Sequence, residues 1–169
     1  MIPQIRFDKK TVKMTAFGRD IGVTNNVRNE LNGLRTSSEV VFSTDQNGEN
    51  GKPYYPRQFP AGKWYITDIV AHDKKKADGT PVEPYLYPFF LQTNAHQTVP
   101  VYKLEIVNDK QRIGAPDGTR EDWLYGLHYS TSSTTLGCIK IVNQDDLLWL
   151  VGQIKAAWHD NQIVSMEVV

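Results

Sequence analysis

The sequence predicts a mainly β domain that carries one C-terminal helix. Short runs of alternating apolar and polar residues recur along the chain, and Gly, Pro and Asn interrupt them at short intervals. Only one stretch, near the C-terminal end, has apolar residues at helical spacing. The chain has 169 residues, of which 40% are hydrophobic, so it can close one sizeable core. We therefore expect residues 1–169 to form a single domain.

Four runs, residues 39–44, 63–70, 101–107 and 163–169, are expected to form strands. Each alternates apolar with polar residues or is rich in aromatic and β-branched residues, which favour extended backbone. Such alternation is typical of strands that bury one face, so we expect all four to belong to one sheet system.

Long loops are expected between these strands. Residues 45–60, 74–84 and 108–121 carry Gly, Pro and Asn at a density that disfavours regular structure. Loops of this length in a small domain usually form the lids or walls of a functional site. Residues 31–35 are expected to contribute a short turn.

The expected helix begins after Asn143, which is a suitable N-cap residue. Asp145 and Asp146 would complement the helix dipole in the first turn. The helix should end near His159, where polar residues follow. Its apolar residues recur at helical spacing: Leu147, Leu150, Val151, Ile154, Ala157 and Trp158.

Composition excludes several classes of function. Nineteen basic and 19 acidic side chains give no net charge, so no global field favours nucleic acid or an anionic membrane. No apolar run is long enough to span a bilayer, and the first residues lack the pattern of a signal peptide. The chain has one cysteine, which excludes an intramolecular disulfide. The partner must therefore be inferred from a local site.

The candidate catalytic pair is His128 and Cys138. An apolar lead-in predicts a strand that delivers His128, and a second apolar run begins directly after Cys138. The small hydroxyl residues at 130–135 should turn the chain in a hairpin-like return that brings the two side chains together. A lone cysteine is more often a small buried hydrophobe, but this arrangement favours a nucleophile.

Each residue type in this segment suits acyl transfer. A free thiol has a pKa of about 8.5, so His128 is needed to accept its proton. The N–H groups around Gly137 and Cys138 are suitable donors to an oxyanion. The backbone carbonyl of Tyr129, or a nearby hydroxyl, would orient the imidazole as the third member.

The sequence TLGCIK at residues 135–140 resembles the catalytic signature of the L,D-transpeptidase family. Residues 59–66 are similar to that family's Pro-x-Gly-x-aromatic strand entry, and residues 84–91 to its aromatic substrate wall. The resemblance covers about residues 10 to 160 loosely and is specific over 124–150. It implies a β-sandwich or partly closed barrel with one C-terminal helix.

Two positions depart from the family pattern. Leu136 stands where the family has a second histidine directly before Gly-Cys, and Lys140 replaces an arginine. The short separation of His128 and Cys138 resembles toxin-type peptidoglycan hydrolases and phage-associated domains. Leu136 therefore weakens an inference of cross-linking more than one of acyl chemistry.

The resemblance implies that Cys138 attacks an amide carbonyl of a peptidoglycan stem peptide and forms a thioester. An amine or water then resolves the thioester, so transpeptidation, carboxypeptidase and endopeptidase activity all stay open. No metal or organic cofactor is implied, and the expected location is the cell envelope, the periplasm or outside the cell. The competing class is a non-catalytic cell-wall-binding or structural module that kept the fold. Oligomeric state is left open.

Four further residues are candidates for substrate binding. Trp123 and Tyr87 are aromatic side chains that suit the wall of a pocket. The Thr135 hydroxyl either contacts substrate or bonds its own backbone in a turn. Lys140 is either structural or solvated, with contact to a substrate carboxylate as the alternative.

Overall fold

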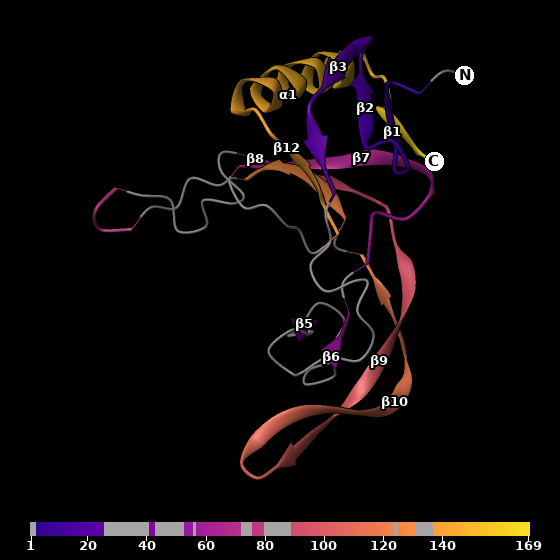
Figure 1. Ribbon diagram of the computed structural model, residues 1–169. Helices are drawn as coiled ribbons and strands as arrows, with labels where there is room; N and C mark the ends of the chain where they lie inside the picture. Colours follow the sequence, from indigo (N-terminus) through magenta and orange to yellow (C-terminus); the bar gives the residue numbers. More distant parts are fainter. Residues whose placement is uncertain are drawn as a thin grey trace.

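The computed structural model describes residues 3–25, 41–42, 53–55, 57–71, 76–79, 89–123, 125–130 and 137–169 (Figure 1). Strands dominate these residues, and they contain one helix, at the C-terminal end. The predicted fold class is therefore confirmed. Within the described ranges, no helix is both long and apolar enough to cross a membrane.

The central feature is a nine-stranded sheet with the order β3-β2-β1-β13-β7-β8-β11-β12-β4. The two edge strands follow each other in the chain and are separated only by Gly22. The edges therefore lie near each other, and the sheet is nearly closed into a barrel. Its strands are β1 (Ile5–Asp8), β2 (Lys13–Ala16), β3 (Arg19–Ile21), β4 (Val23–Thr24), β7 (Gly62–Ala71), β8 (Phe89–Thr93), β11 (Gly126–Tyr129), β12 (Ile139–Ile141) and β13 (Ser165–Val168).

Helix α1 (Gln144–His159) follows β12 directly and has the predicted bounds. The Asn143 side chain caps it by accepting a hydrogen bond of 2.8 Å from the Asp145 N–H. The helix buries one apolar face in the main core, together with the apolar side chains of the sheet. Arg19 of β3 forms an ion pair of 2.9 Å with Asp146 of this helix. Figure 1 shows α1 beside β3 and β12, at the opposite end of the molecule from β10.

A two-stranded ribbon of β9 (Gln97–Val107) and β10 (Lys110–Asp122) runs away from the helix (Figure 1). The short strands β5 (Val41–Phe42) and β6 (Pro53–Tyr54) form a separate pair, and β6 contacts β9. Tyr54 packs there with Val99 and Val101 in a second, smaller core.

The prediction of a loop over residues 108–121 was wrong, because β10 occupies most of it. Asn108 and Asp109 both have positive φ, at 52° and 60°, which is the backbone of a tight hairpin turn. The register shifts on either side of Pro116, so the strand accommodates its Gly and Pro residues as irregularities. Cross-strand pairing with β9 thus outweighs the turn signals within β10.

Each of the four predicted runs contains a strand among its described residues, but these strands do not share one sheet. Residues 63–70 and 163–169 supply β7 and β13 of the large sheet, whereas 101–107 belongs to the ribbon. Of residues 39–44, the structure describes only β5, which pairs with β6. The predicted turn at 31–35 lies outside the described residues, as does most of the predicted loop at 74–84.

Candidate active site

The two strands that frame the candidate site are β11 and β12, and they pair in parallel. Strands were predicted on both sides of the site, and both form. The prediction of a hairpin-like return between them was wrong, because the two strands run in the same direction. The register sets Leu127 opposite Ile139 and His128 opposite Lys140. Cys138 directly precedes β12, so one further step of the register places it opposite Gly126.

Alternation along the strands separates the core from the candidate site. Leu127 and Ile139 are buried in the main core. His128 and Cys138 occupy the alternate positions and therefore share the opposite face of the sheet. A diagonal step across two paired strands corresponds to about 8 Å between their Cα atoms, so the two residues are neighbours on this face. The backbone N–H of Gly126 also donates a hydrogen bond to the thiol, which fixes Cys138 beside β11.

The imidazole of His128 is held in a defined orientation. Its side chain is buried, with 6% of its surface exposed, and its ring lies 5.9 Å from that of Phe90 on β8. Its Nδ1 lies 3.3 Å from the carbonyl oxygen of Tyr129. A carbonyl oxygen only accepts hydrogen bonds, so Nδ1 must carry the hydrogen, and in the neutral imidazole Nε2 then carries the lone pair. The sequence had suggested this carbonyl as the orienting group.

The Cys138 thiol lies in surroundings that keep it protonated. Burial raises its pKa from the ordinary value of 9.0 to about 12, although the hydrogen bond from the Gly126 N–H acts in the opposite direction. The negative charge of the buried Asp122 carboxylate raises the pKa of the thiol further. A resting thiolate is therefore disfavoured, and any reaction of this sulfur at neutral pH needs a base to remove its proton.

Alkylation should report this raised pKa directly. We expect iodoacetamide to modify Cys138 more slowly at pH 8 than it modifies a free cysteine, because the thiolate is the reacting form. The rate should still be rising at pH 10.5, since the pKa of the thiol is about 12. Stopped aliquots analysed by intact mass spectrometry measure the rate. A rate that levels off near pH 8.5 would contradict a desolvated thiol.

Gly137 and Asn25 shape the turn before the cysteine. Gly137 has a φ of 132°, and a Cβ there would lie 2.7 Å from both the Arg57 carbonyl oxygen and the Tyr125 ring. The buried side chain of Asn25 donates hydrogen bonds of 2.9 Å to the carbonyls of Gly137 and Cys138. Asn25 was not predicted as part of the site, because it lies 112 residues from Gly137 in the chain. Both residues fix the backbone that carries the predicted oxyanion donors.

Lys140 is not solvated, contrary to one of the expectations from sequence. Only 1% of its surface is exposed, and burial lowers the pKa of its ammonium group. It lies opposite His128 in the register, on the same face of the sheet. The Lys140 side chain therefore leaves the sheet on the same face as the candidate catalytic pair.

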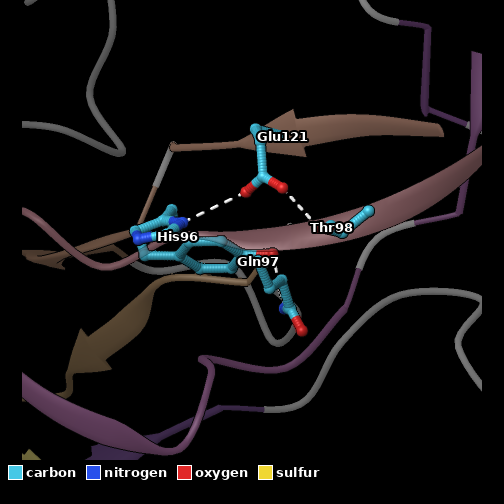
Figure 2. A network of polar contacts seen from close by, with 5 residues as sticks. His96, Gln97, Thr98 and Glu121 are labelled. Carbon is cyan, nitrogen blue, oxygen red and sulfur yellow. Dashed lines mark hydrogen bonds and ion pairs between the residues drawn. The ribbon is translucent and has the colours of Figure 1, made fainter.

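The other candidate binding residues lie apart from this pair or outside the described chain. Trp123 is 48% exposed, and its ring stacks on His96 with a centroid separation of 4.1 Å. Figure 2 shows the polar network beside it, in which the Glu121 carboxylate contacts His96 at 3.1 Å and accepts a hydrogen bond from Thr98. Trp123 thus belongs to an exposed aromatic and polar surface. Thr135 and Tyr87 lie outside the described residues.

Among the described residues, no cluster of His, Cys, Asp or Glu has the arrangement of a metal site. No family model, curated protein or solved structure matches the chain.

Proposed function

We propose that the protein is a cysteine-dependent acyl transferase or peptidase that uses Cys138 as nucleophile and His128 as base. The observation that carries this proposal is the parallel pairing of β11 and β12, which puts both residues on one face of the sheet as diagonal neighbours. The contact of His128 Nδ1 with Tyr129 supports it, because this contact leaves the basic lone pair on Nε2.

The proposed reaction begins with transfer of the thiol proton to Nε2 of His128. The sulfur of Cys138 attacks the amide carbonyl, and N–H groups near Gly137 stabilise the oxyanion. When the carbon–nitrogen bond breaks, the imidazolium returns the proton to the leaving amine and a thioester remains. A second amine or water then attacks the thioester and releases the acyl group. Proton transfer occurs at the moment of attack, as the raised pKa of the thiol requires.

The proposed substrate is a peptidoglycan stem peptide. This part of the proposal rests on the resemblance of residues 135–140 to the L,D-transpeptidase signature. A protein with this substrate would work in the cell envelope or outside the cell. The acyl acceptor stays open, because an amine and water attack the same thioester.

Digestion of purified muropeptides tests this function. We expect the wild-type protein to produce new species and Cys138→Ala to produce none, because alanine cannot form the thioester. Mass spectrometry of the products identifies both the bond that is cut and the acceptor. Val142→Ala is a suitable matched control, because Val142 is exposed, lies close in the chain and has no proposed role. Products that appear equally with Cys138→Ala would show that the activity does not depend on this thiol.

A non-catalytic cell-wall-binding module is the second candidate. The raised pKa of Cys138 favours it, because an inert buried cysteine has the same property. This candidate predicts that wild type and Cys138→Ala sediment equally with purified sacculi and that neither changes the muropeptide profile. A Cys138-dependent product would exclude it.

A further inference from the structure

Arg120 on β10 is a buried cation whose hydrogen-bond donors the described structure leaves unused. Only 4% of its surface is exposed, although arginine is rarely buried without a partner. Within the described part of the chain, Nε and both terminal nitrogens of its guanidinium lack any hydrogen-bond partner. Its one described polar contact is weak, since the guanidinium lies over the Tyr54 ring at 5.0 Å. A buried group with several unused donors is best explained by an anion that completes the site.

The position of Arg120 connects it to the candidate active site. Arg120 and Asp122 alternate with Glu121 along β10, so they share the face opposite the Glu121 side chain and its contacts with His96 and Thr98. Both are buried, and their partners on β9 are Val99 and Gln97. The charge of Asp122 acts on the Cys138 thiol. On this face of the ribbon, Asp122 therefore lies between Arg120 and the candidate nucleophile.

We propose that Arg120 binds a carboxylate of the peptide substrate while the scissile carbonyl lies at Cys138. This inference rests on the proposed function and adds a binding site to it. A guanidinium presents parallel N–H donors that match the two oxygens of a carboxylate. A phosphate fits less well, because its second negative charge would lie near the buried Asp122 carboxylate.

Tyr54 lies against the guanidinium of Arg120. Its ring centroid is 5.0 Å from the guanidinium carbon, and the ring is buried and belongs to β6, a strand of only two residues. The N–H donors of a guanidinium lie in its plane, so a carboxylate can bind them while the ring keeps its contact with the guanidinium face.

Binding of matched small peptides tests the proposal without requiring turnover. The probes are N-acetyl-L-lysyl-D-alanine and its C-terminal amide, and calorimetry measures their affinity for the full chain carrying Cys138→Ala. We expect the acid to bind more tightly than the amide by about tenfold to a hundredfold. Arg120→Met should abolish this difference. Arg6→Met is the control, because the Arg6 side chain is half exposed and forms an ion pair with Glu167 on the surface.

Thermal unfolding separates binding from structure. Arg120→Met should raise the unfolding temperature of the peptide-free protein, because methionine fills a similar volume without buried, unpartnered hydrogen-bond donors. Equal affinity for acid and amide would overturn the proposal, and so would a lower unfolding temperature in Arg120→Met. Inorganic phosphate that binds more tightly than the acid would overturn the assignment to a carboxylate. Arg120-dependent binding of the acid, without any Cys138-dependent product, would support this site and reject only the proposed catalysis.

Discussion

Replacing His128 with asparagine should lower the rate of acyl transfer by roughly a hundredfold to ten-thousandfold, the range that general-base catalysis contributes. Asparagine places an amide nitrogen where Nδ1 now lies, so it can keep the contact with the Tyr129 carbonyl, at 3.3 Å in the native protein. It has no group at the position of Nε2. The substitution therefore removes the proposed base and preserves the contact that orients it.

The pH dependence of the residual activity identifies the missing step. Burial raises the pKa of Cys138 to about 12. In a variant without a base, the reaction therefore depends on the small fraction of thiolate that forms when solvent removes the proton. We expect its rate to rise about tenfold per pH unit through the accessible alkaline range, because the thiolate fraction rises in that proportion below the pKa. The wild type should lack this steep rise, since His128 removes the proton as the sulfur attacks.

His159→Asn is the matched control for this experiment. His159 lies in the last turn of α1 and is exposed, so its replacement should leave the rate unchanged. The rate of product formation from muropeptides is measured for all three proteins across pH, together with their unfolding temperatures. A His128→Asn protein that is folded and retains the wild-type rate would remove the histidine from the mechanism.

Local sequence patterns predicted an element correctly where its structure depends on residues that are close to it in the chain. The helix was predicted with its cap because Asn143 acts on Asp145, which is two residues away. The strands that carry His128 and precede α1 were predicted from their own apolar residues. The ribbon was missed because its stability comes from pairing Pro116 and other poor strand formers with residues of β9. Whether such residues form a strand depends on the neighbouring strand more than on their own propensity.

The same distinction applies to the candidate site. His128, Cys138 and Gly137 were found because they lie close together in the sequence. Asn25 and Asp122 were missed as members of the site, since nothing near them in the sequence indicates that they approach Cys138. The relative direction of β11 and β12 was also wrong. The hydroxyl-rich segment predicts that the chain turns, but it does not specify whether the next strand returns antiparallel or parallel.

Gly137→Ala should destabilise the protein by about 3 kcal/mol or more, although the substitution removes no existing contact. Two causes add together. A φ of 132° lies in a region that residues with a Cβ rarely adopt, which costs about 1–3 kcal/mol. The new methyl group would also meet the Arg57 carbonyl and the Tyr125 ring at 2.7 Å, and such overpacking costs about 1–3 kcal/mol. Urea denaturation monitored by tryptophan fluorescence measures the change in the free energy of unfolding.

Gly152→Ala is the control, and the opposite sign is expected for it. Gly152 lies within α1, and a Cβ there meets nothing within 4 Å. Alanine should therefore stabilise the protein by about 0.5–1 kcal/mol through its higher helix propensity. The same chemical change then has opposite effects at two sites in one chain. If Gly137→Ala were neutral, the backbone before Cys138 would be free to adjust, and it could not hold oxyanion donors in the fixed positions that the proposed reaction requires.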